Sequence, residues 1–379
     1  MKIILIGMFG KNLSGEPLAQ GFERKGCQVI RISVEPEHPK RSGKFDLHIM
    51  DNYATSRTEG MGTEARLTEA VQLQRMYRRL NLRTIVQLYP DCDLIFFIQN
   101  KYAWDFEGVT IPIYYYHTDL ININLPLHAD LIKGFFYAYI GAADEMLDNY
   151  TYDFNHWYWR ELIPYGCDPT LYHPEKSWEE RTIFCGFMGS LAQNNHSQNG
   201  LKAHIYDDRN RILKALIDRN YNGFVMQRFS SVEKYAEFLG DCQVGINIPG
   251  TYGRINQRQY EVLASGCLLL QYWYPELKQL GLTDFENCLT FTSMDSLLDK
   301  LQWIQDHSNE ANDIRLKGNQ YFKDHRCSWQ ERAEDMLDRI TRAPTSHDQE
   351  WIDFVKYQRQ KESNPYLKEE YPVQMFKVK

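Results

Sequence analysis

Short apolar runs alternate with amphipathic stretches over most of the chain, and this alternation constrains the fold more than any other feature of the sequence. Runs such as Leu94–Ile98 and 111–115 are continuously apolar, as strands are when both faces of a parallel sheet are covered. Amphipathic stretches such as 16–25 have the spacing of helices that pack on one side. A succession of this kind predicts open, doubly wound α/β sheets.

A stretch rich in proline and glycine at 164–174 divides the succession into two series. The predicted strands are 2–6, 28–33, 94–98, 111–115 and 135–140 before it, and 182–187, 223–227, 243–248 and 267–272 after it. We therefore expect an N-terminal Rossmann-like domain at 1–163, a linker at 164–178 and a C-terminal domain at 179–342. The polar extension at 343–379 either packs back on the first domain or forms a loose tail. A cleft between two such domains is a common place for ligands.

The composition excludes several classes of protein. A net charge of −7 gives no overall attraction to nucleic acid, and no run approaches the ~18 apolar residues of a membrane span. The eight cysteines lack metal-site spacing, which favours buried, reduced thiols in a cytoplasmic protein. The Asp91-Cys92-Asp93 triplet has the form of a metal site but directly precedes a strand, so we interpret it as a turn. We therefore predict no metal site.

The segment 247–270 carries most of the chemistry. It consists of a strand, a glycine-rich loop, a helix at Gln257–Ala264 and another buried strand, and such a loop presents free backbone N–H groups to an anion at a helix N-terminus. In the first turn of that helix, Arg258 adds a guanidinium that grips phosphate in two places. One turn later, Glu261 suits two adjacent hydroxyls, as on a ribose. A plain surface pair between Arg258 and Glu261 fits the spacing equally well.

This segment resembles the donor-binding core of group 1 glycosyltransferases with the GT-B fold, in the branch of CgeB-like spore maturation proteins and related phage glycosyltransferases. The motif is RQYE at 258–261 followed by ASGC at 264–267. The linker sequence PYGCDP at 164–169 and the strand and turn IFCGFMGS at 183–190 agree with it. The resemblance covers about 164–337, and over 1–163 it is architectural only.

The resemblance implies two Rossmann-like domains that face a central cleft, and transfer of a sugar from a nucleotide-sugar to a hydroxyl acceptor. It implies no metal and no cofactor beyond the nucleotide-sugar itself. Glu261 would hold the ribose hydroxyls. The residues expected to hold the diphosphate are Arg258, Gly189, Ser190, Gly250, Tyr252 and Gly253, with Arg211 as a further helper.

The sequence departs from the family at one position. Many group 1 enzymes carry two glutamates separated by seven residues; the second matches Glu261, but Gly253 stands at the first. Retention or inversion at the sugar therefore stays open.

The first domain offers its own candidates for the sugar and the acceptor. Gly7 and Gly10 form a glycine turn at the end of the first strand that can approach the sugar, and an ordinary tight turn fits as well. His117 and Asp119 follow a buried strand, where side chains face the cleft. Either would orient the sugar or take the acceptor proton, whereas a structural histidine and a capping aspartate fit equally.

Two acceptor classes follow from these features. One is a carbohydrate or a cell-envelope molecule, and the other is a hydroxymethylated pyrimidine in phage DNA. Arg75 and Arg79 share a helix face that suits DNA, although a solvated face is the commoner explanation. Two rival functions remain on the same fold: a sugar-nucleotide epimerase, and a non-catalytic nucleotide-sugar-binding protein.

Overall fold

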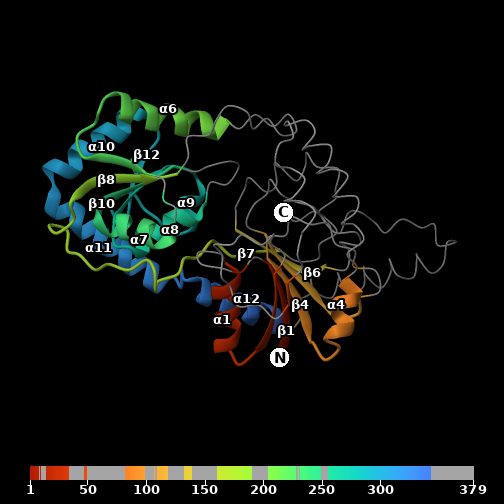
Figure 1. The fold of residues 1–379 in the computed structure, drawn as a ribbon. Coiled ribbons are helices and arrows are strands. Elements are labelled where there is room, and N and C mark those ends of the chain that lie inside the picture. The colour runs from red at the N-terminus through yellow and green to blue at the C-terminus, as the bar shows by residue number, and fades with distance from the viewer. Residues whose placement is uncertain are drawn as a thin grey trace.

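The computed structural model describes residues 1–7, 9, 14–33, 47–48, 82–98, 106, 109–117, 132–138, 160–189, 204–227, 229, 231–248 and 255–342 of the chain. Within them the chain forms two parallel sheets, each covered by helices (Figure 1). The GT-B architecture of two Rossmann-like units, expected from the sequence, is confirmed.

The first sheet has the order β3-β2-β1-β4-β5-β6-β7. Its strands are β1 (Lys2–Gly7), β2 (Gln28–Ser33), β3 (Leu47–His48), β4 (Leu94–Ile98), β5 (Ile113–His117), β6 (Ile132–Tyr137) and β7 (Arg160–Leu162). In β1, Ile3 and Leu5 join the core under α1 (Gly15–Arg24), whereas Ile4 and Ile6 join the core on the opposite face, with α4 (Leu82–Leu88). Both faces of β1 are thus buried, which explains its continuous apolar sequence.

The second sheet has the order β12-β11-β10-β8-β9. Its strands are β8 (Ile183–Met188), β9 (Phe224–Gln227), β10 (Cys242–Asn247), β11 (Leu268–Tyr272) and β12 (Leu289–Phe291). Its helices are α6 (His204–Asp218), α7 (Val232–Asp241), α8 (Gln257–Ala264), α9 (Glu276–Gln279), α10 (Met294–Asp306) and α11 (Ser308–Asp324). The strand order reverses between β8 and β10, the point at which open α/β sheets bind ligands beyond the carboxyl ends of the strands.

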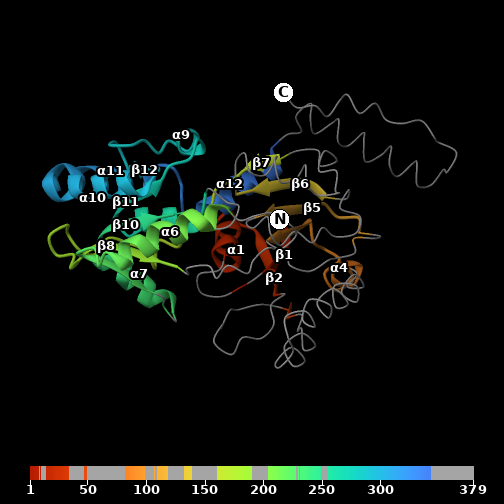
Figure 2. The same ribbon diagram turned by 90° about the horizontal axis from the view of Figure 1, so that it is seen from above.

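The last described helix, α12 (Trp329–Thr341), returns to the first sheet and packs against α1 (Figures 1 and 2). Ala333 and Met336 of α12 share one core with Leu18 and Phe22 of α1. The two helices approach so closely that a Cβ on Gly21 would lie 2.4 Å from the carbonyl oxygen of Gln330. The sequence-based division at 342 grouped this helix with the second domain, whereas its packing joins it to the first sheet.

All eight cysteines are buried and unpaired, as the sequence predicted. None of the helices in the described ranges is both long enough and apolar enough to span a bilayer. The extension at 343–379 and the predicted helix face of Arg75 and Arg79 lie outside the described residues.

Candidate functional site

The candidate site lies where β8 and β10 end and α8 begins. β8 runs into Gly189, and β10 ends at Asn247. The side chain of Asn256 caps α8 by accepting a hydrogen bond from the amide of Gln259, at 3.2 Å. Asn256 also donates from Nδ2 to Oδ1 of Asn247, at 3.1 Å, so the start of α8 is tied to the end of β10.

Arg258 stands in the first turn of α8 and reaches toward β8. Its guanidinium carbon lies 4.6 Å from the ring centroid of Phe187. Its Nη1 is 3.4 Å from Oδ1 of Asn247 and 3.4 Å from the carbonyl oxygen of Ile248, and both acceptors are neutral. A Cβ on Gly189 would lie 3.0 Å from Nη2, so glycine leaves the backbone room beside the guanidinium.

Arg258 forms no ion pair within the described part of the chain, and its buried Nε has no hydrogen-bond partner there. A half-buried guanidinium surrounded by neutral acceptors, at the N-terminus of a helix, favours an anionic ligand.

Arg209 of α6 brings a second cation to the same ring. It is 5% exposed, and its guanidinium carbon lies 5.2 Å from the ring centroid of Phe187. No motif in the sequence marks Arg209, and the neighbouring Arg211, which was the predicted helper, has an exposed side chain. The helical spacing does distinguish the two arginines. Position 209 lies on one face with the buried Ile212, Leu213 and Leu216, whereas position 211 does not.

Glu261 lies one turn after Arg258 and is only 5% exposed, so it does not form the surface pair that the spacing allowed. The hydroxyl of Tyr235 in α7 donates to its Oε2 at 3.0 Å. Burial raises the pKa of Tyr235 and of Tyr172, and the nearby Glu261 carboxylate raises both further. The same two causes raise the pKa of the Cys167 thiol. Tyr172, Tyr235 and Cys167 lie in other segments of the chain and belong to none of the predicted site residues.

The other predicted site residues divide into described and undescribed ones. Gly7 ends β1, where a Cβ would lie 3.1 Å from Cβ of Ile98 at the end of β4, so the glycine allows the two strand ends to approach. His117 is the last residue of β5. Six candidates lie outside the described residues, namely Gly10, Asp119, Ser190, Gly250, Tyr252 and Gly253, as do Arg75 and Arg79.

The Asp91-Cys92-Asp93 triplet is the turn that the sequence predicted. Asp91 pairs with Nζ of Lys2 at 2.7 Å, and Asp93 accepts from the backbone amide of Lys2 at 2.7 Å. The triplet therefore lies at the amino ends of β1 and β4, the opposite edge of the sheet from a ligand site.

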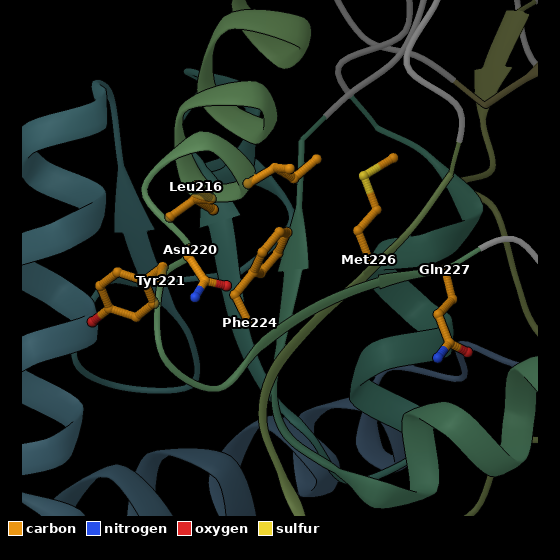
Figure 3. A pocket seen from close by; sticks show the side chains of 7 residues that line it. Leu216, Asn220, Tyr221, Phe224, Met226 and Gln227 are labelled. Carbon is orange, nitrogen blue, oxygen red and sulfur yellow. The ribbon is translucent and has the colours of Figure 1, made fainter.

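A hollow of about 460 Å³ opens beside β9, the last strand in the described order of the second sheet (Figure 3). It is lined by Leu216, Ile217, Asn220, Tyr221, Phe224, Met226 and Gln227, from the end of α6, the following turn and β9. None of the candidate site residues lines it.

Part of the sequence matches a protein family, and several solved structures share the fold. Residues 196–338 match the family model described as glycosyl transferase-like, and this segment includes α8 with Arg258 and Glu261. Curated proteins give no match to the sequence.

Several solved structures share the fold at low sequence identity. Sucrose-phosphate synthase from Thermosynechococcus elongatus is 12% identical with a TM-score of 0.56, covering 90% of this chain and 98% of its own. HepE from Anabaena, in complex with UDP and glucose, is 11% identical with a TM-score of 0.55, covering 90% and 99%. A glycosyltransferase from Rickettsia africae is 13% identical with a TM-score of 0.52, covering 90% and 99%.

The described structure has the two-domain fold of GT-B glycosyltransferases, as the sequence predicted. Within the second domain, the segment that carries α8 matches the glycosyl transferase-like family model.

Proposed function

We propose that the chain transfers a sugar from a nucleoside diphosphate sugar to a hydroxyl group, with the nucleotide bound over the carboxyl ends of β8 and β10. The observation that carries this proposal is the position of Arg258, which meets no carboxylate in the described structure and shares the ring of Phe187 with Arg209. The fold shared with HepE, which was solved with UDP and glucose, supports the same placement.

The two arginines supply the charge that the reaction needs. When the bond from sugar to diphosphate breaks, negative charge develops on the leaving phosphate, and fixed guanidinium groups stabilise it. In this proposal they take the place that a metal ion has in other sugar transfers, so the reaction requires neither metal nor cofactor. Glu261 accepts hydrogen bonds from the ribose hydroxyls, and closure of the first domain over the donor excludes water.

The first domain supplies the acceptor side of the reaction. Gly7 stands at the point where the strand order reverses between β1 and β4, and His117 ends β5, two strands along the same edge. We assign His117 or Asp119 to the acceptor proton or to the orientation of the sugar. The acceptor is a carbohydrate or a hydroxymethylated pyrimidine of DNA. Kinship with the CgeB-like branch and a cytoplasmic location, which eight unpaired cysteines favour, complete the proposal.

Calorimetry tests the donor site. UDP, GDP, ADP and CDP are titrated into the wild-type protein and into Arg258→Gln and Glu261→Gln. We expect one nucleotide to bind, and each variant to lose more than about tenfold in affinity, as removal of a charged hydrogen bond implies. Arg326→Gln is the matched control, because Arg326 is exposed and pairs with Glu334 and Asp335. Unchanged affinity in folded Arg258→Gln would overturn the assignment.

Product analysis separates transfer from the rival functions. Nucleotide-sugars are incubated with and without carbohydrate acceptors or hydroxymethylated DNA, and the products are identified by mass spectrometry. A transferase gives a glycosylated acceptor together with free nucleotide. An epimerase converts the nucleotide-sugar without an acceptor, and a binding protein leaves it unchanged.

A further inference from the structure

The carboxylate of Glu261 is enclosed by phenol groups from two other parts of the chain. Tyr235 comes from α7 and donates to Oε2 at 3.0 Å. Tyr172 comes from the connection between the sheets, and both tyrosines are 1% exposed. Their rings meet edge to face at 5.8 Å between centroids. Glu261 is thus held by residues that precede it in the chain and lie outside its own helix.

The two phenols are themselves fixed. Phe229 stacks on Tyr235 with 6.2 Å between ring centroids, and both tyrosine rings are buried in the core. Burial raises the pKa of each tyrosine further above its ordinary value, and the charge of Glu261 adds to the rise. Both hydroxyls therefore keep their protons, and remain hydrogen-bond donors, throughout the neutral range.

The two oxygens of a carboxylate together accept about four hydrogen bonds, and the phenol of Tyr235 fixes the direction of one of them. A fixed donor on one side leaves the remaining lone pairs in a fixed direction, which is what recognition of two adjacent hydroxyls requires. Without the donor, the glutamate side chain gains rotamers and loses that direction.

We propose that Tyr235 and Tyr172 are positioning residues, which hold Glu261 against the ribose and thereby set a preference for ribonucleotides over deoxyribonucleotides. The inference rests on the proposed function, in which Glu261 receives the ribose hydroxyls. It deepens that function by assigning sugar discrimination to residues that do not themselves contact the nucleotide.

The test compares matched nucleotide pairs. UDP, GDP, ADP and CDP are each titrated together with their 2′-deoxy forms, and the pair that binds the wild-type protein most tightly is carried to Tyr235→Phe and Tyr172→Phe. We define the discrimination ratio as the affinity for the ribonucleotide divided by the affinity for its 2′-deoxy form. We expect Tyr235→Phe to lower the affinity for the ribonucleotide about tenfold and that for the deoxynucleotide less than about twofold, so that this ratio falls. A general loss of structure would weaken both members of the pair equally.

Tyr274→Phe is the control. Tyr274 is also buried, and its hydroxyl donates to Oε1 of Gln259 on the same helix at 2.6 Å. The Tyr274→Phe variant also loses one buried phenol hydrogen bond, but this bond does not involve Glu261. Its discrimination ratio should therefore match that of the wild type. Thermal unfolding of all three variants confirms that each is folded at the titration temperature.

Glu261→Gln makes the two possible failures distinguishable. If Glu261→Gln keeps the wild-type ratio, or if none of the nucleotides binds, the ribose assignment itself is wrong and the inference falls with it. If Glu261→Gln loses the ratio while Tyr235→Phe and Tyr172→Phe both keep it, the proposed function stands and the positioning role is overturned.

Discussion

The backbone amide of Cys167 donates a hydrogen bond to the carbonyl oxygen of Cys327 at 3.2 Å. The carbonyl of Cys167 in turn accepts from the amide of Trp329 at 3.1 Å. The two connections between the sheets therefore run side by side, and any rotation of one sheet relative to the other bends both at this point. The thiol of Cys167 also lies 3.5 Å from the carbonyl oxygen of Tyr260 in α8, so this crossing adjoins the helix that carries Arg258 and Glu261.

The first prediction concerns this crossing. A Cβ on Gly166 would lie 2.7 Å from the amide nitrogen of Trp329, so Gly166→Ala must push the two connections apart. We expect a loss of about 1–3 kcal/mol in the free energy of unfolding, measured by urea titration.

Gly240→Ala is the control for this prediction, because a Cβ there meets no atom within 4 Å and the residue lies inside α7. It should gain about 0.4–1 kcal/mol, since alanine reduces the freedom of the unfolded chain. Equal stability of the two variants would contradict the close crossing.

The second prediction separates Arg209 from Arg211. Arg209→Ala should weaken the binding of the nucleoside diphosphate more than about tenfold and that of the monophosphate less, because a guanidinium beside Phe187 faces the terminal phosphate in our proposal. Arg211→Ala removes the same charge from the exposed face of the same helix, and should leave both affinities within about twofold. Equal losses in the two variants would show that the effect is one of overall charge.

The third prediction concerns alkaline pH. Burial raises the pKa of the Cys267 and Cys327 thiols to about 11, and of Cys185 and Cys288 to about 12, from an ordinary value of 9.0. Above pH 9 the thiols keep their protons in the folded protein and lose them in the unfolded chain. Their contribution to the free energy of unfolding is therefore complete below pH 9 and is lost as the pH rises toward 11 or 12. Each thiol contributes about 1.4 kcal/mol per pH unit in that window.

Urea titrations at pH 8, 9 and 10 measure this slope. Cys267→Ala lowers stability at pH 8, but its slope above pH 9 should be shallower by the contribution of one thiol. A slope that is unchanged in Cys267→Ala would mean that this thiol does not retain its proton in the folded protein.

The fourth prediction is that sugar transfer continues at an unchanged rate in excess EDTA, because Arg258 and Arg209 supply the charge for the leaving diphosphate. The rate is followed by release of free nucleotide. A rate that falls in EDTA and returns with Mg²⁺ or Mn²⁺ would assign that charge to a metal.

Much of the fold followed from local patterns. The predicted bounds of Gln28–Ser33, Leu94–Ile98 and Gln257–Ala264 match the observed ones, and at the helix Asn256 caps the start. The strand predicted at 111–115 instead begins at Ile113, since Pro112 donates no ladder hydrogen bond. β7 has three residues, too few for any pattern. Ser328 and Glu331 form a capping box, which indicates the start of α12. No local pattern predicts that this helix packs against α1.

Only those site residues that stand close together in the sequence could be predicted from it. Arg258 and Glu261 stand in one short motif, and both lie at the strand order reversal. Arg209, Tyr172 and Tyr235 reach the same place from three other segments, which only the folded sheet brings together. A sequence pattern records spacing along one element, whereas these contacts depend on how different elements pack.

The return of α12 to α1 also dictates an order of events at the ribosome. Leu18 and Phe22 are synthesised before the second sheet, whereas Ala333 and Met336, which share their core, are synthesised after it. The apolar face of α1 therefore stays uncovered until the second sheet has been synthesised, and the core of the N-terminal unit is completed only when α12 follows.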